Sequence, residues 1–538
     1  MDFIKNSMGC YKKERGLLMK KKLFVLITSL MITNLFSNTF QIQDVNYEIK
    51  GRTRESIIKK NFPIDQNKIF NTKEELEEYI SDLSSSLSNT RVFEDVEISY
   101  TEEDAIQSET DSNTESLIPI NLTIKLSESF SFLAVPYFKY DSNSGTTFKV
   151  KAKDYNFLGT LNPMNVDINF KLINNEETNE EGSQIGINFS YDHPFQIKKI
   201  NLTWFNDYSF DYTFKKKIPE WNANTGLNVE IPIKNKNLYV KFIQGFTNNF
   251  DYKPYDDEIY FSENLSISLP IKLTENRKIG SVTYTPNINF NYYWDKNGIS
   301  ENNSGLYSPR LSVGHSLSLG KVNWVENFRR GFSLSISNSY SYNWIQKEIV
   351  PYVNFEINSH FNFVDSNYAL LRRLGINANV YGFIYIPLNH KYYYGEQYGD
   401  NLRGIRDEQY FSSDIPEFSS EKALSSFTAI TLCLDFPFKL FETNFTKKFF
   451  NYFNFELQVA PFIDISLGYN RYTKRYFNPK DGFYTAGMEI LVYPRKWSSV
   501  TVRGSFGIDM GRFLNIVDTS WRKKVSLYEF SFGLGLHY

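Results

Sequence analysis

One arginine and one aspartate have the types and positions to form an ion pair inside a folded chain. Arg403 and Gly404 lie in the polar segment Lys391 to Ser420, and Asp464 lies on the polar face of the alternating run Phe453 to Tyr469. A guanidinium confined away from bulk water needs a carboxylate, and its planar fork can donate two hydrogen bonds to one. We therefore expect Arg403 to bond to Asp464. The alternative is that Asp464 is one of several charges lining an aqueous pore and that Arg403 stays in solvent.

Residues that serve enzymes and metal sites show no useful spacing in this chain. The sequence contains no HExxH, GxSxG, phosphate-loop or dinucleotide-binding pattern. The histidines are scattered, at His193, His315, His360, His390 and His537. We therefore expect no enzyme activity, no catalytic residue, no cofactor and no metal. Arg503 and Asp509 lie on the polar face of a later alternating run, so they are weaker candidates for the network around Arg403.

The end of the chain shows the kind of element that would position such a pair. From Val525 to Tyr538 the side chains alternate, and because successive side chains of a strand point to opposite faces, one face is apolar or aromatic. The residues of that face are Tyr528, Phe530, Phe532, Leu534, Leu536 and Tyr538. A terminal aromatic residue on the apolar face is typical of the closing strand of a bacterial outer-membrane β-barrel. Porins share this pattern, so it predicts location rather than activity.

The composition of the chain fits a β-barrel better than a helical membrane protein. Aromatic residues make up 17% of the 538 residues, with 47 Phe and 37 Tyr, yet the mean hydropathy is −0.41. A membrane-spanning helix needs about 20 apolar residues in a row, and no such run follows the N-terminal region. Many aromatic residues without long apolar runs are expected of a barrel with aromatic girdles and a wet interior. The net charge of −2 gives no support for nucleic-acid binding.

Alternating runs separated by Asn, Asp, Gly and Ser continue from about Phe130 to the end of the chain. We count roughly eighteen such runs, and bacterial barrels usually have an even number of strands. The sequence therefore predicts a mainly β fold, with an antiparallel transmembrane β-barrel over residues 129–538. We favour about 16 strands and keep about 18 as the alternative, because one or two runs could be folded loops. An array of soluble β-sandwiches would need domain linkers, which we do not find.

The N-terminal region reads as a targeting sequence. Lys20 to Lys22 precede the apolar stretch Leu23 to Phe36, which predicts a secretory signal peptide at residues 19–40 and leaves residues 1–18 as an upstream extension. A transmembrane anchor is the alternative, but the apolar stretch is short for it. Once the signal peptide is removed Cys433 is the remaining cysteine, so we expect no internal disulfide. Its place in an alternating run predicts that it faces the barrel interior.

Residues 41–128 carry helix signals and predict one small α+β domain before the barrel. Thr72 and Glu75 form a capping-box pattern. An apolar stripe at helical spacing follows it, made of Leu76, Ile80, Leu83 and Leu87. A strand over Val45 to Lys50 and a first helix over about Thr53 to Asn61 come before this helix, and two alternating runs come after it. The predicted order is therefore β-α-α-β-β.

This order resembles a POTRA domain, the periplasmic module of the BamA/TamA superfamily of outer-membrane proteins. The resemblance rests on Ile49-Lys50-Gly51 with Thr53, and on the stretch Leu87 to Val96, which is similar to the helix-to-strand junction of that family. The stretch Lys153 to Thr160 also looks like an early Asp-x-Asn-x-x-Gly turn of the family's barrel.

The polar loop and the aspartate strand resemble the same family. Arg403-Gly404 is followed by five strand-like runs and resembles the tip of the family's sixth extracellular loop, with Leu402 and Ile405 replacing the usual Val and aromatic residue. Phe462 to Ser466 is similar to its Phe-x-Asp-x-Gly motif, with Ser in place of the Gly, which puts close backbone approach there in doubt. In that family the loop arginine pairs with the strand aspartate inside the barrel.

The resemblance covers nearly the whole mature chain and implies a location in the bacterial outer membrane, with the POTRA-like domain in the periplasm. It implies insertion or translocation of polypeptides without a cofactor. The partners would be outer-membrane lipid, unfolded or extended polypeptides and accessory periplasmic proteins, and no nucleic acid. The strand Tyr528 to Tyr538 would then form a lateral seam with the first barrel strand. A different class stays open, namely a passive outer-membrane pore or a surface-exposed adhesin or antigen.

Overall fold

The computed structural model describes most of the chain from Thr39 onward. The described residues are 39–103, 117–141, 145–175, 180–198, 200–215, 217–234, 236–248, 259–276, 280–294, 309–344, 347–386, 395–397, 402–405, 410–419, 421–447, 453–497 and 500–534. The upstream extension and all but the last residues of the predicted signal peptide lie outside them. The chain divides into two compact units. The segments Gly51–Ile57 and Ser88–Glu94 group with the barrel unit rather than with the α+β unit.

The N-terminal unit is a small sheet with two helices. Its elements are β1 (Thr39–Lys50), α2 (Glu55–Asn61), β2 (Ile69–Phe70), α3 (Lys73–Asn89), β3 (Phe93–Glu102) and β4 (Leu117–Glu128), and the sheet order is β2-β1-β4-β3. The Thr72 hydroxyl accepts a hydrogen bond from the Glu75 amide at 3.2 Å, as the capping pattern predicts. The stripe of leucine and isoleucine side chains on α3 is buried. No helix in the described part of the chain is long and apolar enough to span a membrane.

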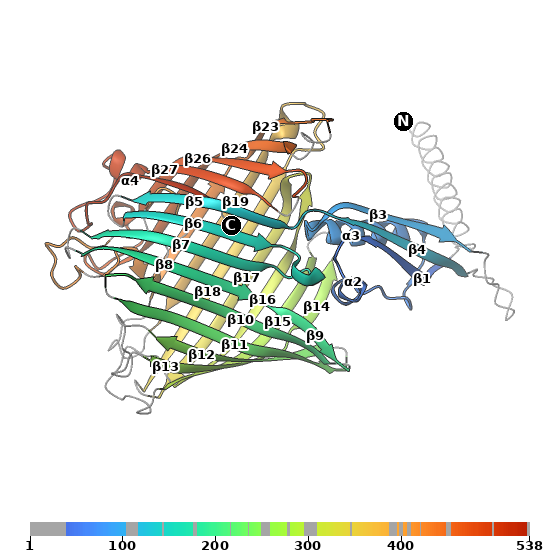
Figure 1. Ribbon diagram of the computed structural model, residues 1–538, viewed down its shortest axis with the longest axis horizontal. Coiled ribbons are helices and arrows are strands. Elements are labelled where there is room, and N and C mark those ends of the chain that lie inside the picture. Colours follow the sequence, from blue (N-terminus) through green and yellow to red (C-terminus); the bar gives the residue numbers. More distant parts are fainter. Residues whose placement is uncertain are drawn as a thin grey trace, which may run out of the picture. The chain divides into compact units, whose positions relative to one another are not determined.

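The remaining strands close into one barrel, and its described strand pairs are antiparallel. They are β5 (Phe132–Asp141), β6 (Gly145–Asp154), β7 (Met164–Asn175), β8 (Glu180–Tyr191), β9 (His193–Ile197), β10 (Ile200–Thr213), β11 (Ile218–Ile233), β12 (Lys236–Asn248), β13 (Ile259–Ser268), β14 (Ile271–Asn276), β15 (Gly280–Trp294), β16 (Arg310–Val325), β17 (Phe328–Asn343), β18 (Glu348–Asn362), β19 (Gly375–Tyr385), β22 (Thr428–Asp435), β23 (Phe438–Glu442), β24 (Phe455–Asn470), β25 (Arg475–Tyr476), β26 (Phe483–Pro494), β27 (Val502–Asp509) and β28 (Tyr528–Leu534). Short elements outside the wall are η1 (Phe157–Gly159), η2 (Leu371–Arg373), β20 (Glu396–Gln397), β21 (Ser425–Ser426), η4 (Pro479–Asp481) and α4 (Met510–Phe513). Figure 1 shows the closing region, where β5 and β6 lie near β26 and β27.

Some strands of the wall are interrupted, so we call each complete strand across the wall a stave, whether it has one segment or two. The barrel has 18 staves among the described residues. The closed sheet runs through 22 strand segments, but four of them continue a neighbouring segment against the same partner strand. These are β9 after β8, β14 after β13, β23 after β22, and β25 before β26. The predicted barrel is thus confirmed, with the strand number that the sequence left as the alternative rather than the favoured 16. Five staves follow the long loop, as predicted.

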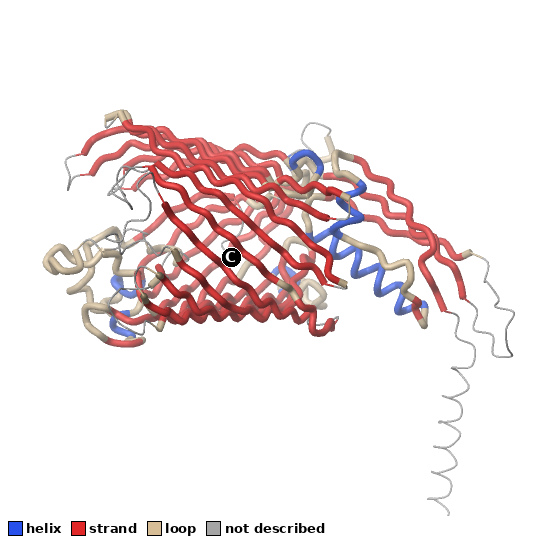
Figure 2. The backbone as a smooth tube through the Cα atoms, turned by 90° about the horizontal axis from the view of Figure 1, so that it is seen from below, coloured by secondary structure: helices blue, strands red, loops and turns tan. Residues whose placement is uncertain are grey.

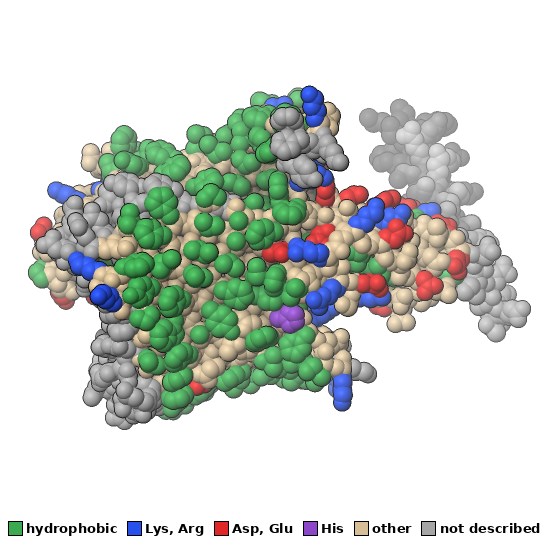
Figure 3. Space-filling view, viewed as in Figure 1, with side chains coloured by type: hydrophobic (Ala, Val, Ile, Leu, Met, Phe, Trp, Pro, Cys, Tyr) green, Lys and Arg blue, Asp and Glu red, His purple; other side chains and the backbone are tan. Residues whose placement is uncertain are grey.

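The outer face of the wall is apolar. Side chains alternate along each stave, so that Phe148 and Val150 are 50% and 44% exposed on the outside of β6, whereas Lys149 pairs with Asp167 of β7 on the inner face. Figure 2 shows the continuous wall of strands, and Figure 3 shows hydrophobic side chains spread over its surface. A closed sheet leaves no unpaired backbone edge, and an apolar exterior is what a bilayer requires of it.

The closing strand β28 follows the predicted alternation where it is described. Tyr528 and Phe530 are 58% and 61% exposed, while Glu529 faces inward opposite Gly507 of β27. β28 lies next to β5 in the closed sheet. Phe532 lies on the same outer face, and the side chain of Leu534 and all of Leu536 and Tyr538 lie outside the described residues.

Candidate functional site

The tip of the long loop lies inside the barrel, with Arg403 bonded to Asp464. The Arg403 Nε and Nη2 atoms donate to the two carboxylate oxygens of Asp464 at 3.0 and 2.5 Å. The backbone amide of Arg403 donates to the same carboxylate at 3.1 Å. Arg403 is 4% exposed and Asp464 is 0% exposed. The structure therefore brings the two residues together in the two-pronged arrangement expected from the sequence, and Arg403 does not stay in solvent.

Two further carboxylates surround the Arg403 guanidinium. Its Nη1 atom lies 2.5 Å from an oxygen of Asp435 and 3.5 Å from an oxygen of Glu489. The other oxygen of Glu489 lies 3.4 Å from Arg503, so Arg503 extends the cluster. Burial lowers the pKa of the Arg403 guanidinium, but hydrogen bonding to Asp464 and the neighbouring negative charges raise that pKa more, and Arg403 remains protonated. We call Arg403, Asp435, Asp464 and Glu489 the arginine cluster.

The register of neighbouring staves places the carboxylates of the arginine cluster. Asp464 of β24 lies directly opposite Cys433 of β22, and Asp435 follows Cys433 on the same face two residues later. Phe462 precedes Asp464 on the inner face of β24, and its ring centroid lies 3.9 Å from the Arg403 guanidinium. The face of the ring attracts the cation. Cys433 is buried and lies on the inner face of the barrel, as predicted.

Gly404 allows the loop to touch the barrel wall backbone to backbone. Its φ of +85° lies in the left-handed region that favours glycine. A Cβ atom on Gly404 would lie 2.7 Å from the carbonyl carbon of Gly507 on β27, and a Cβ atom on Gly507 would lie 2.6 Å from the Gly404 Cα. The amide of Gly404 donates to Glu529 of the closing strand β28 at 3.1 Å. The loop tip therefore contacts both of the last two staves.

Apolar side chains hold the loop on either side of Arg403. Leu402 and Ile405 are 3% and 1% exposed. They belong to a buried cluster with Phe383, Phe411, Ala423, Leu424, Ala429, Phe483 and Trp521. Trp521 lies in the loop before β28, and its carbonyl accepts a hydrogen bond from the Ser412 amide at 2.9 Å. Leu402 and Ile405, the two residues that differ from the loop tip that the sequence resembles, are thus buried apolar side chains. The hydrogen bond between Ser412 and Trp521 joins the long loop to the loop that leads into β28.

Two sequence expectations near the cluster need correction or refinement. Ser466, which stands where the family has Gly, shares a hydrogen bond with the Thr431 hydroxyl at 2.8 Å, and the close backbone approach is made at Gly507 instead. Asp509 lies on the inner face as expected, but its carboxylate accepts a hydrogen bond from the Arg512 amide at 3.0 Å and caps α4.

Sequence reasoning missed Asp435, Glu489 and Gly507, and it named Phe462 only as part of a motif without a role in the site. All four lie on the inward-facing positions of their runs, so alternation could have marked them as candidates. Alternation cannot tell which inward residues of different strands lie level with one another, because that depends on pairing register.

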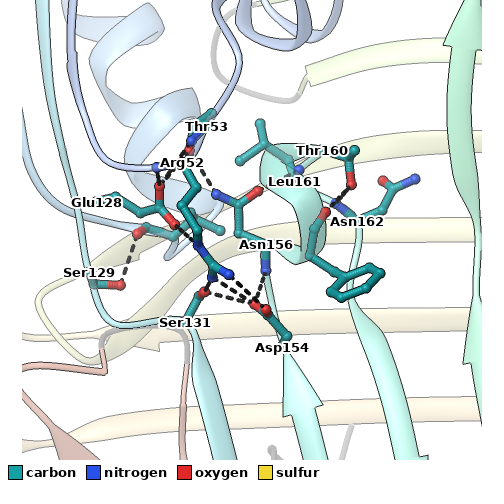
Figure 4. A network of polar contacts seen from close by, with 12 residues as sticks. Arg52, Thr53, Glu128, Ser129, Ser131, Asp154, Asn156, Thr160, Leu161 and Asn162 are labelled. Carbon is teal, nitrogen blue, oxygen red and sulfur yellow. Dashed lines mark hydrogen bonds and ion pairs between the residues drawn. The ribbon is translucent and has the colours of Figure 1, made fainter.

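A second polar network lies at the first turn of the barrel (Figure 4). The Arg52 guanidinium donates to both oxygens of Asp154 at 3.2 Å, and the Ser131 hydroxyl donates to the same carboxylate at 2.7 Å. The Asn156 side chain donates to the Thr53 hydroxyl at 2.7 Å. Asp154 and Asn156 belong to the turn that resembles Asp-x-Asn-x-x-Gly, so this turn has polar partners that sequence reasoning did not assign.

The same network fixes the stretch that leads into β5. The Glu128 carboxylate accepts hydrogen bonds from the amides of Arg52 and Thr53 at 2.6 and 3.0 Å. Gly159 has a φ of +69°, and a Cβ atom there would lie 1.9 Å from the Arg52 carbonyl oxygen. Only glycine fits this contact. The base of the first stave is therefore held by charge-assisted hydrogen bonds and one close backbone approach.

The arginine cluster fastens the long loop to the barrel wall. Within the described residues no group of His, Cys, Asp and Glu side chains is arranged to hold a metal ion. The Nε, Nη1 and Nη2 atoms of Arg403 all donate hydrogen bonds to carboxylates. The long loop that carries Arg403 fills part of the lumen. The fold and the site together define a transmembrane β-barrel of the outer-membrane type with an internal loop plug and a small α+β unit before it.

Known structures with this architecture resemble the chain. BamA from Haemophilus ducreyi lacking POTRA domains 1-3 is 11% identical, with 91% of this chain and 84% of that chain covered and a TM-score of 0.38. CdiB from Acinetobacter baumannii is 12% identical, with 91% and 73% covered and a TM-score of 0.42. CdiB from Escherichia coli is 9% identical, with 92% and 90% covered and a TM-score of 0.37. Comparison with protein-family profiles and with curated protein sequences gives no match. Similarity at this level concerns the fold alone.

The contacts predict unequal effects for two aspartate substitutions. Asp464→Asn removes the charge that accepts three hydrogen bonds from Arg403, whereas Asp435→Asn removes the charge that accepts one. A hydrogen bond to a charged group contributes about 1.5–3 kcal/mol. Limited proteolysis of the folded barrel in detergent should therefore cut the loop faster in Asp464→Asn than in Asp435→Asn. Equal cleavage rates in the two variants would contradict this assignment.

Proposed function

We propose that the chain inserts or translocates polypeptides in the bacterial outer membrane, with its α+β unit acting as a POTRA-like module in the periplasm. The observation that carries the proposal is the docked loop, whose tip binds the arginine cluster and also the closing strand through Gly404 and Glu529. A passive pore gains nothing from this arrangement, because burying an arginine among carboxylates has a large desolvation cost. A loop fastened to the last two staves is suited to sense or control the closing strand.

Strand addition supplies the proposed mechanism. An unpaired sheet edge recruits an incoming extended segment through backbone hydrogen bonds. The lateral seam between β28 and β5 would provide such an edge in the membrane, and β3 at the end of the N-terminal sheet would provide one before it. The partners are therefore extended polypeptides, outer-membrane lipid and accessory periplasmic proteins. No nucleotide, cofactor, metal or catalytic residue takes part in this mechanism.

Locking the seam tests the proposal. In a Cys433→Ser background, a cysteine at Ser531 of β28 is combined in turn with cysteines along β5, and the pair that forms a disulfide is kept. We expect cells that carry the oxidised lock to lose the outer-membrane proteins that depend on this chain, and reductant to restore them.

A matched lock away from the seam separates this effect from general rigidity. Ser316 of β16 and Ser337 of β17 are direct partners in the wall, so a disulfide between them closes no seam. It should leave assembly unchanged. If the oxidised seam lock leaves the outer-membrane proteome as it is in the reduced protein, the lateral seam is not used.

A further inference from the structure

The β16–β17 hairpin extends beyond the staves on either side of it. β16 and β17 pair with each other as far as Val325 and Phe328. The described pairing of β16 with β15 ends at Gly320, and that of β17 with β18 ends at Gly331. Residues 321–330, which we call the hairpin tip, therefore pair as a strand with each other and leave the wall.

Two glycines bend the hairpin where the tip begins. Gly320 and Gly331 have φ values of +138° and +133°, a region that side-chain-bearing residues rarely adopt. A Cβ atom on Gly320 would lie 2.3 Å from the Phe332 carbonyl oxygen, and one on Gly331 would lie 2.0 Å from the Lys321 carbonyl oxygen. Gly320 lies opposite Ser333, and Gly331 lies opposite Val322. A glycine inside a strand often marks a tight bend.

The hairpin tip reaches staves on another side of the barrel. The Asn327 carbonyl accepts a hydrogen bond from the Gln458 side chain of β24 at 3.2 Å. The Trp324 ring packs edge-on against Tyr493 of β26, with ring centroids 6.5 Å apart. Between β17 and these strands the wall order runs through β18, β19, β22 and β23. The tip therefore crosses the interior of the barrel instead of lining it.

The hairpin tip approaches wall carboxylates of the arginine cluster. A cavity of about 20 Å³ is lined by Trp324 and Asn327 of the tip and by Asp435 of β22 and Glu489 of β26. A space of this size holds about one water molecule. The tip thus closes against the same carboxylates that bind the loop, from the opposite end of the barrel.

Two residues of the segment Ser88–Glu94 hold the tip in place. The Asn89 side chain accepts a hydrogen bond from the Trp324 amide at 2.9 Å and donates to Asn323 at 3.0 Å. The Arg91 guanidinium donates to the Asn327 side chain at 3.1 Å and lies 4.1 Å from the centroid of the Trp324 ring. Arg91 also has a left-handed φ of 55°. A residue other than glycine keeps that conformation where its surroundings hold it.

We propose that the hairpin tip is a gate across the barrel lumen and that Asn89 and Arg91 are its latch. Release of the latch lets the tip swing about Gly320 and Gly331 and opens the lumen at the end opposite the docked loop. Helix α3 ends at Asn89, so a ligand that binds the α+β unit has a covalent route to the latch. The gate goes beyond the proposed function and does not depend on the identity of any polypeptide substrate.

Channel recordings test the gate. The full chain is reconstituted in planar bilayers with and without Arg403→Ala, so that the docked loop does not mask movement of the tip. In the Arg403→Ala background we expect Asn89→Ala/Arg91→Ala to raise the open probability by about tenfold, since it removes three hydrogen bonds and two cation–π contacts. Arg372→Ala, an exposed arginine of the β18–β19 turn, serves as the matched control and should change nothing.

A covalent lock gives the opposite prediction. Cysteines at Asn327 and Gln458, in a Cys433→Ser/Arg403→Ala background, should reduce conductance when oxidised, and reductant should restore it. If the disulfide forms on a gel and conductance stays the same, the tip is not a gate. The gate is also wrong if the latch variant records like Arg372→Ala while its heat-dependent gel mobility shows a folded barrel. The recordings use no substrate, so a gated chain that assembles no protein refutes the proposed function alone.

Discussion

Replacing Arg403 with alanine should release the loop from the lumen and abolish the dependent assembly of outer-membrane proteins. The substitution leaves the buried carboxylates of Asp435, Asp464 and Glu489 facing one another without their cation. Breaking a buried ion pair by removing one partner costs about 3–5 kcal/mol. Because the wall is held by backbone pairing, we expect the loop to detach while the barrel stays closed. Limited proteolysis should show rapid cleavage of the loop with unchanged heat-dependent gel mobility of the barrel.

Two other arginine variants grade this effect. Arg403→Lys keeps a positive charge but loses the fork that binds Asp464 at two points, so we expect intermediate protection of the loop. Arg503→Ala removes a cation that lies 3.4 Å from Glu489 at the edge of the cluster, and it should have the smallest effect. A protease pattern for Arg403→Ala that matches the unsubstituted protein would contradict the role given to the cluster.

Adding one methyl group to Gly507 should also unseat the loop. A Cβ atom there would lie 2.6 Å from the Gly404 Cα and 2.7 Å from the Gly404 amide nitrogen, and neither strand nor loop backbone can yield cheaply. Overpacking of this kind costs about 1–3 kcal/mol. Gly404→Ala adds the strain of a left-handed φ, worth about 1–2 kcal/mol, so we expect it to free the loop at least as completely. The measurement is the rate of loop cleavage in the folded protein.

The same strand offers a matched control for the glycine variants. A Cβ atom on Gly504 would lie 3.8 Å from the Phe532 ring, an ordinary contact. Gly504→Ala should therefore leave the loop protected. If Gly507→Ala and Gly504→Ala are cleaved alike, backbone contact between loop and β27 does not hold the loop.

The face on which each site residue lies was readable from the sequence, whereas its partners were mostly not. Alternation in β24 put Asp464 inside the barrel, and an arginine in a polar loop is a natural partner for a buried carboxylate. The level of Asp435 and Glu489 relative to Asp464 depends on strand register, which is set by pairing across the wall. Gly507 looked like any strand glycine until the loop backbone was seen against it.

The strand number and the hairpin tip show a second limit of sequence reasoning. Segments such as β22 and β23 share one stave but are separated by a bend, and β23 carries a register shift between Lys439 and Phe441, so counting runs does not count staves. In β16 the apolar positions change phase at Gly320, from Leu317 and Leu319 to Val322 and Trp324. That change marks a break in the strand but does not place the tip, because its departure from the wall depends on backbone φ and on contacts with Asn89 and Arg91.

Depletion of the chain followed by quantification of the outer-membrane and secreted proteomes tests the proposed function most directly. If the chain handles polypeptides, at least one other outer-membrane or secreted protein should fall in step with it. Loss of many barrels would indicate a general insertase, and loss of a single secreted partner would indicate a dedicated transporter. Re-expression of the chain should restore the lost proteins, and re-expression of Arg403→Ala should not. A proteome that is unchanged except for the chain itself would contradict the proposal and favour a pore or an adhesin.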